Sequence, residues 1–153
     1  MRGDRTVSAA RNYMRMEFPN LPENVAFART TVAVFASQLD FTLDELDEIK
    51  VATSEAVSNT VIHAYGKGTG QVVVCCQIFP DRLEIEVTDE GVGIEDVEKA
   101  LEPAYTTVPE ERMGLGLVFI NEYMDALAIQ SQPGQGTKIH MVKYVRAPRP
   151  DGV

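Results

Sequence analysis

A carboxylate followed by two glycines stands directly after a stretch of alternating apolar and polar residues. The alternation covers residues 83–89 and ends at Asp89, with Gly91 and Gly93 just beyond it, which is the pattern of a half-buried strand and a turn. Here Asp89 could accept a hydrogen bond from an exocyclic amine, and the glycines would let the backbone lie against a flat ring. An ordinary turn would contain the same residues, so this segment alone does not distinguish a ligand-binding site from a turn.

A second pair of glycines is placed to hold a phosphate. Gly114 and Gly116 open an apolar stretch over residues 115–124 that predicts a buried helix, and the free N–H groups and dipole at a helix start favour a phosphate. The sequence has no G-x-x-x-x-G-K-S/T segment and no H-R-D loop, and Phe119 fills the third glycine position of a dinucleotide fingerprint. P-loop proteins, ordinary protein kinases and Rossmann proteins are therefore excluded.

Two polar residues share one face of a predicted long helix. Glu55 and Asn59 are four residues apart, and His63 follows four residues later, so a helix would stack the three side chains along one side. That side is either a solvated polar surface or a site in which a carboxylate and an amide act together. His63 fits a residue that caps or packs near the helix end better than a catalytic one.

The elements that must position these segments follow from periodicity and caps. Thr42 and Glu45 predict a capping box, and Asn24 is the expected N-cap of the preceding helix. A fourth glycine segment, Gly134 to Thr137, by itself fits a turn between the last two strands. The predicted strands cover residues 13–18, 71–79, 83–89, 127–132 and 137–144, and the predicted helices cover residues 25–39, 43–64, 96–101 and 115–124.

These helices are too few and too clustered for a doubly wound parallel sheet. We therefore predict a two-layer α/β sandwich, with a mixed, mostly antiparallel sheet and its helices on one face. Residues 13–145 are expected to form one domain, between a flexible N-terminal extension over residues 1–12 and a flexible tail over residues 146–153. Cys75 and Cys76 are adjacent in a predicted strand and should point to opposite faces, without a mutual disulfide.

Charge and apolar content exclude several classes of protein. The 153 residues include 23 acidic and 14 basic side chains, for a formal net charge of −9, which disfavours direct binding to nucleic acid. The longest apolar runs are too short to cross a membrane, and residues 1–12 lack the apolar stretch of a secretory signal. We expect a cytoplasmic protein.

Taken together, the four segments resemble the Bergerat ATP-binding fold shared by gyrase, Hsp90, MutL and histidine kinases. The shared features are E-x-x-x-N on a helix, D-x-G-x-G after a strand, G-x-G at a helix start and G-x-G-T before the last strand, over about residues 21–144. Within this superfamily the chain is most similar to the anti-sigma factor serine kinases of the sporulation sigma F type. The segments that carry this likeness are residues 24–29, 43–50, 54–64, 89–94 and 106–110.

The resemblance implies a role for each residue at these positions. Asn59 would bind Mg²⁺ through its amide oxygen, and Glu55 would accept the proton of an incoming hydroxyl. Asp89 would bind the adenine amine, assisted by Thr137. The remaining ATP-binding residues implied are Gly91, Gly93, Thr106, Thr107, Arg112, Gly114 and Gly116, with residues 103–113 forming a lid.

The same resemblance implies a serine kinase that sequesters a sigma factor when ATP is bound and phosphorylates an anti-anti-sigma protein. Histidine kinases need an accepting histidine on a separate helical hairpin, which this chain lacks, and gyrase-like relatives need a further domain. Homodimers are implied, with the strand over residues 13–18 as a candidate edge for the contact. Arg29 is a candidate partner contact, and the alternative is an ordinary solvated surface residue. The alternatives are a sigma B type anti-sigma kinase, which generally lacks the Thr-Thr-x-Pro-Glu lid, and a non-catalytic nucleotide-gated module.

Overall fold

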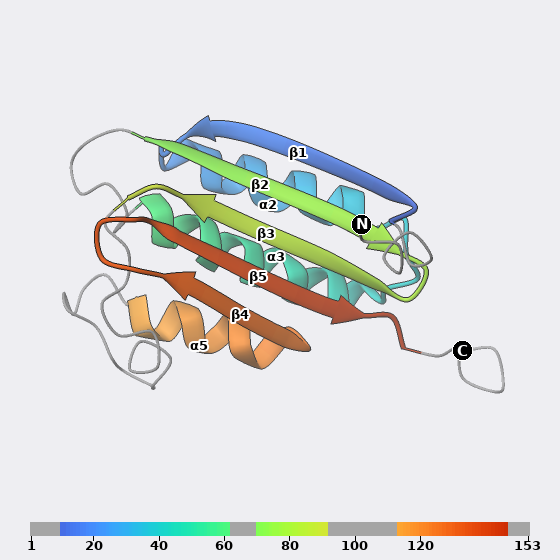
Figure 1. Cartoon of the computed structure of the whole chain (residues 1–153). Coiled ribbons are helices and arrows are strands. Elements are labelled where there is room, and N and C mark those ends of the chain that lie inside the picture. The colour runs from blue at the N-terminus through green and yellow to red at the C-terminus, as the bar shows by residue number, and fades with distance from the viewer. Residues whose placement is uncertain (1–9, 62–69, 92–112, 147–153) are drawn as a thin grey trace, which may run out of the picture.

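The computed structural model describes residues 10–61, 70–91 and 113–146. Figure 1 shows two layers, a twisted sheet and the described helices, which lie along one of its faces. The elements are β1 (Asn12–Pro19), α2 (Glu23–Ala36), α3 (Leu43–Asn59), β2 (Gln71–Phe79), β3 (Arg82–Asp89), α5 (Met113–Tyr123), β4 (Ala126–Ser131) and β5 (Thr137–Tyr144). The predicted α/β sandwich with helices on one face is confirmed.

The sheet has five strands in the order β1-β2-β3-β5-β4, so β1 and β4 are its edges (Figure 1). Each of the four pairings between described strands is antiparallel. At one end of the sheet, Asp89 of β3 lies opposite Thr137 of β5, and Thr137 lies opposite Ser131 of β4. These three residues therefore form a row across β3, β5 and β4 at that end of the sheet.

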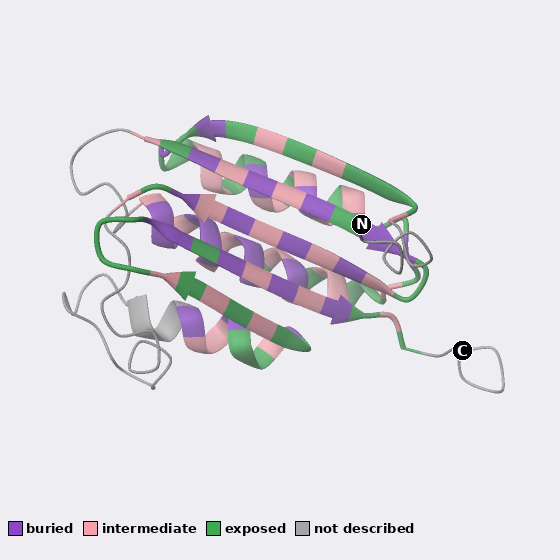
Figure 2. Ribbon diagram, viewed as in Figure 1, coloured by how far each residue is buried: buried purple, intermediate pink, exposed green. Residues whose placement is uncertain are grey.

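The core lies between the sheet and the helices. Along β2 and β3, buried and more exposed side chains alternate, and the pattern is visible as bands in Figure 2. Cys76 is fully buried, while Cys75 is half-buried on the other face, and both thiols are free, as predicted. The helices contribute the small buried side chains Ala28, Val32, Ala36, Ala52 and Ala56, which allow close approach to the sheet.

The helix ends match the sequence patterns only in part. The capping box is confirmed, since Thr42 accepts from the Glu45 N–H at 3.1 Å and Glu45 accepts from the Thr42 N–H at 2.9 Å. The predicted N-cap at Asn24 is wrong, because the backbone is already helical at Pro22 and the Asn24 side chain instead donates to the Pro19 carbonyl. Helix α2 therefore begins at Glu23 and ends at Ala36, three residues before its predicted end.

The ends of the described chain are tied to the sheet. The Arg11 N–H donates to the Ile78 carbonyl just before β1. After β5, Arg146 forms an ion pair of 2.8 Å with Asp125. Within the described ranges, no helix is both long enough and apolar enough to cross a membrane.

Candidate functional site

The ends of four elements lie together at one end of the molecule. Figure 1 shows the C-terminal ends of α3 and β3 at the same end of the sandwich as the first residues of α5 and β5. Asn59 is the last residue of α3, Asp89 the last of β3 and Thr137 the first of β5. The fold therefore brings these three predicted site residues to one end of the molecule.

Asp89 carries a buried carboxylate with one oxygen left over. Its Oδ1 accepts a hydrogen bond of 2.8 Å from the Gly91 N–H. Its Oδ2 is buried and has no hydrogen-bond partner among the described residues. Burial raises the pKa of Asp89, and the backbone N–H groups of Gly91 and Thr137 oppose that rise. A buried acceptor of this kind is expected to meet a hydrogen-bond donor.

Asn59 presents a second unpaired oxygen. The residue is 7% exposed, and its Oδ1 has no hydrogen-bond partner within the described part of the chain. Glu55 lies one turn earlier on α3 and is half-buried. Residues 60 and 61 continue α3 with π-helical geometry, a feature that is frequent at functional sites.

The β4–β5 turn packs directly onto the end of β3. Gly136 has a φ of +87°, and a Cβ there would overlap the Asp89 carbonyl oxygen and lie 2.7 Å from the Glu90 Cα. Glycine is therefore required at this position, both for the conformation and for the space. A groove of about 660 Å³ lies at this corner, and its walls include Asp89, Gly136, Thr137 and Ser131.

The phosphate-binding and lid residues are described only in part. Gly114 and Gly116 lie in the first turn of α5, where the N–H groups have no partner within the helix. This position suits the predicted contact with phosphate. The other predicted residues, namely Gly93, Thr106, Thr107 and Arg112, lie outside the described residues, as do His63, the helix predicted over residues 96–101 and residues 103–112 of the lid.

Arg29, the candidate partner contact, is half-buried on α2. Its Nη1 donates a hydrogen bond of 3.2 Å to the Ser54 Oγ on α3. Ser54 directly precedes Glu55 in the chain, so the guanidinium is anchored beside the segment that carries the predicted base.

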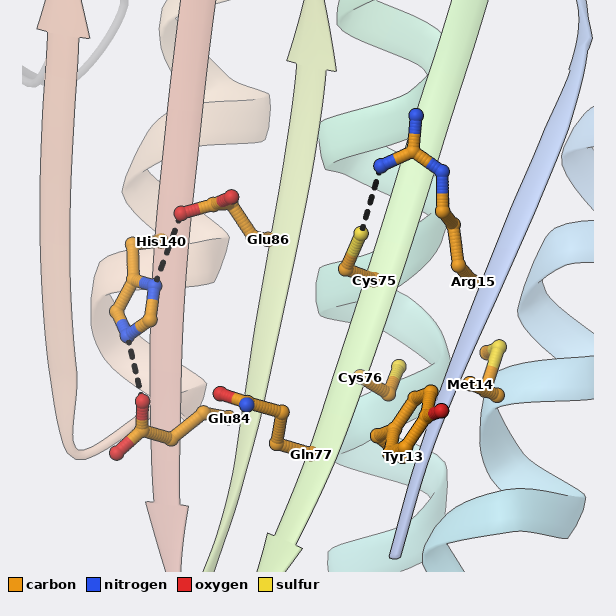
Figure 3. A pocket seen from close by; sticks show the side chains of 9 residues that line it. All are labelled: Tyr13, Met14, Arg15, Cys75, Cys76, Gln77, Glu84, Glu86 and His140. Atoms are coloured by element: carbon orange, nitrogen blue, oxygen red, sulfur yellow. Dashed lines mark hydrogen bonds and ion pairs between the residues drawn. The ribbon is translucent and has the colours of Figure 1, made fainter. Parts of the chain in front are cut away.

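A separate pocket of about 320 Å³ lies on the face of the sheet that the helices leave open (Figure 3). His140 contacts two carboxylates there, at 3.1 Å from Glu84 and 3.6 Å from Glu86. Arg15 donates to the Cys75 sulfur at 3.8 Å. None of the predicted site residues lines this pocket, and in the described ranges no cluster of three or more His, Cys, Asp or Glu residues could hold a metal ion.

The sequence analysis missed two hydroxyl groups, those of Ser131 and Thr53. Ser131 and Thr137 form a hydrogen bond of 2.9 Å across the β4–β5 pair. They are six residues apart on either side of the glycine turn, and a hairpin register centred on that turn would have paired them. The second missed group is Thr53 on α3, whose buried hydroxyl has no partner among the described residues, and no sequence signal marks it.

The residues of this site fit an adenine nucleotide and Mg²⁺. The spare Asp89 oxygen is an acceptor for an exocyclic amine. The spare Asn59 oxygen is the kind of ligand that Mg²⁺, a hard cation, takes from proteins. When bound, the metal would neutralise phosphate charge.

Comparison with known proteins gives the class and then the family. Residues 18–143 match the histidine kinase-like ATPase domain. The mycobacterial sensor histidine kinase MprB has a similar structure, with a TM-score of 0.56 over 88% of this chain and 99% of that chain, at 22% identity. This likeness supports the fold, which is that of a histidine kinase-like ATPase domain.

Two relatives narrow the assignment. An anti-sigma F factor from Pasteuria penetrans is 51% identical over 142 residues, which cover 91% of this chain and 95% of the relative. An anti-sigma F factor from Clostridium acetobutylicum is 50% identical over 133 residues, which cover 86% and 93%. The chain belongs to the anti-sigma F factor family within this class.

Proposed function

We propose that this protein is an anti-sigma factor and a serine protein kinase. It binds Mg-ATP, sequesters a sporulation sigma factor of the sigma F type, and phosphorylates a serine of the anti-anti-sigma protein that opposes it. The observation that carries the proposal is a pair of buried oxygens, on Asn59 and Asp89, that have no hydrogen-bond partner among the described residues and lie at the end of the fold where α5 begins. The names of the relatives support the anti-sigma part of the proposal.

Each residue of the site has its own role in nucleotide binding. Asp89 binds the adenine amine, with Thr137 and Gly91 beside it, and Gly93 gives room for the flat ring. Gly114 and Gly116 hold phosphates at the start of α5, Arg112 neutralises their charge, and Thr106 and Thr107 belong to the lid. Asn59 binds Mg²⁺ through its Oδ1.

Glu55 is the proposed base for the transfer itself. It accepts the hydroxyl proton of the partner's serine as the serine oxygen bonds to the γ-phosphorus, while the bond from that phosphorus to the bridging oxygen breaks and ADP leaves. The transition state is loose, so part of the benefit comes from orientation of the serine. A positioned base of this kind contributes a factor of about 10² to 10⁴ in rate.

We further propose that Arg29 contacts the protein partners. Its bond to Ser54 holds the guanidinium next to the Glu55 segment, which is where an incoming serine must arrive. In Arg29→Ala we expect weaker binding of a partner with unchanged affinity for ATP. If Arg29→Ala instead lowers the affinity for ATP by as large a factor as the affinity for the partner, Arg29 is a structural residue of the site.

Homodimers are proposed as the working form in the cytoplasm. Strand β1 is an edge of the sheet, and an open edge offers unpaired backbone groups to a second chain. Sedimentation equilibrium measures the mass directly. A monomer at concentrations of about 100 μM would contradict the dimer and leave the kinase proposal intact.

The test of the kinase proposal is phosphotransfer from labelled Mg-ATP to a candidate anti-anti-sigma protein. We expect phosphoserine on the partner, and a rate at least about 100-fold lower in Glu55→Gln while ATP binding survives. The matched control is Asp47→Asn, because Asp47 is an acidic residue of the same helix with a side chain that is 69% exposed. Equal rates in wild type and Glu55→Gln would remove Glu55 as the base, and retained ATP binding with no phosphotransfer in the wild type would make the protein a non-catalytic module.

A further inference from the structure

The hydrogen bonds around Ser131 determine the direction of the Thr137 hydroxyl proton in the proposed adenine pocket. Ser131 ends β4, and its Oγ donates a bond of 3.0 Å to the Gly136 carbonyl. The same Oγ lies 2.9 Å from the Thr137 Oγ1. A serine hydroxyl has one proton and two lone pairs, and a carbonyl oxygen can only accept.

These counts fix the direction of the second bond. Since the Ser131 proton goes to the Gly136 carbonyl, the bond between the two hydroxyls must use the Thr137 proton. Thr137 then has no proton left to donate, and it keeps a lone pair for a further partner. Thr137 is 5% exposed and lies directly opposite Asp89 in the β3–β5 pair.

The turn holds this arrangement in place. Gly136 supplies the carbonyl that takes the Ser131 proton, and its own backbone packs against Asp89 and Glu90 without room for a side chain. The accepting carbonyl therefore cannot shift without moving the end of β3 as well. Ser131, Thr137 and Asp89 form a row across β4, β5 and β3.

We propose that Ser131 is a positioning residue that makes Thr137 a hydrogen-bond acceptor, so that the pocket selects a base with an exocyclic amine over one with a carbonyl. The inference rests on the proposed nucleotide site. Asp89 Oδ2 and Thr137 Oγ1 then offer two acceptors in neighbouring strands, and an amine has two hydrogens to donate. A carbonyl in the same place would meet two acceptors and no donor.

The experiment compares the dissociation constants of ATP and inosine triphosphate, which has a carbonyl where ATP has the amine. We expect the wild type to prefer ATP. In Ser131→Ala, the Thr137 proton is released and can be donated to the carbonyl, so the preference for ATP should fall by about 3- to 10-fold, the value of one hydrogen bond. Ser131→Thr, which keeps the hydroxyl, should retain the preference.

Two further measurements make the result specific. Ser37→Ala is the matched control, because Ser37 is an exposed serine whose hydroxyl also donates to a carbonyl, that of Val34; it should leave the preference unchanged. In the wild type, purine riboside triphosphate, which has neither amine nor carbonyl at that position, should bind more weakly than ATP and more tightly than inosine triphosphate. This series needs no variant to fold.

The outcomes separate the two proposals. A wild type that binds no ATP would overturn the nucleotide site itself. A wild type that prefers ATP, together with a Ser131→Ala variant that weakens both nucleotides by the same factor, would overturn only the role of Ser131, because a purely structural serine would act in that way.

Discussion

Two glycines of the same turn provide a matched pair for testing how the site is built. Gly134 and Gly136 both have positive φ, +80° and +87°. An alanine at either position must hold a left-handed conformation, which costs about 1 to 2 kcal/mol. Their surroundings differ, because an added Cβ has nothing within 4 Å at Gly134 and overlaps the Asp89 carbonyl at Gly136.

The difference in surroundings sets the expected magnitudes. Gly134→Ala should lower the free energy of unfolding by about 1 kcal/mol, because only the backbone conformation is unfavourable. Gly136→Ala has the same conformational cost and must also displace the end of β3, and overpacking of this kind adds about 1 to 3 kcal/mol. We therefore expect a loss of about 3 kcal/mol for Gly136→Ala.

Urea unfolding measures both losses. With a slope of about 2 kcal/mol per molar urea, the midpoint should fall by about 0.5 M in Gly134→Ala and by about 1.5 M in Gly136→Ala. Gly136→Ala should also weaken ATP binding, because the displaced strand end carries Asp89, and Gly134→Ala should not. Equal losses of stability in the two variants would refute the close packing of the turn on β3.

Three further predictions concern the charged residues and the cap. Since burial raises the pKa of Asp89, ionisation of this group disfavours folding, and wild type should lose stability relative to Asp89→Asn as pH rises from below about 3.9 through the raised pKa, in urea titrations at each pH. In the same assay Glu48→Ala should cost about 2 to 4 kcal/mol, because it leaves the buried Lys143 ammonium with the Tyr123 carbonyl but without its carboxylate partner. Lys143→Met should cost about 1 kcal/mol, because the Glu48 carboxylate that it leaves is 40% exposed; the reverse order of the two losses would contradict this reasoning. Thr42→Ala should cost about 1 kcal/mol by thermal unfolding, and adding Glu45→Ala should cost less than the sum of the single changes, since the two residues share one capping box.

Periodicity in the sequence predicted the elements that have strong patterns. The strands over residues 71–79 and 137–144 have the predicted bounds, the first from its run of β-branched and apolar residues and the second from the turn that precedes it. Helix ends were less certain, since they depend on local competition for backbone groups. Asn24 has the residue type of an N-cap, yet Pro22 occupies the cap position of α2 and the Asn24 side chain donates to the Pro19 carbonyl.

Motifs in the sequence indicated the candidate site residues, but not the way the fold holds them. Asp89 was found from its position after a strand, whereas its unpaired oxygen depends on burial by distant segments. The bond between Ser131 and Thr137 depends on the exact strand register. The packing of Gly136 on Asp89 joins residues 47 positions apart in sequence, and no local pattern reports a contact of that kind.

In the proposed site, the Asp89 and Asn59 oxygens that lack a partner in the described structure bind the adenine and the metal of one nucleotide. Isothermal titration calorimetry with ATP, in the presence and absence of Mg²⁺, tests this claim most directly. We predict saturable binding of one ATP per chain, loss of binding in Asp89→Ala, and loss of the Mg²⁺ dependence in Asn59→Ala. ATP binding that is absent from the wild type, or that survives unchanged in both variants, would contradict the claim.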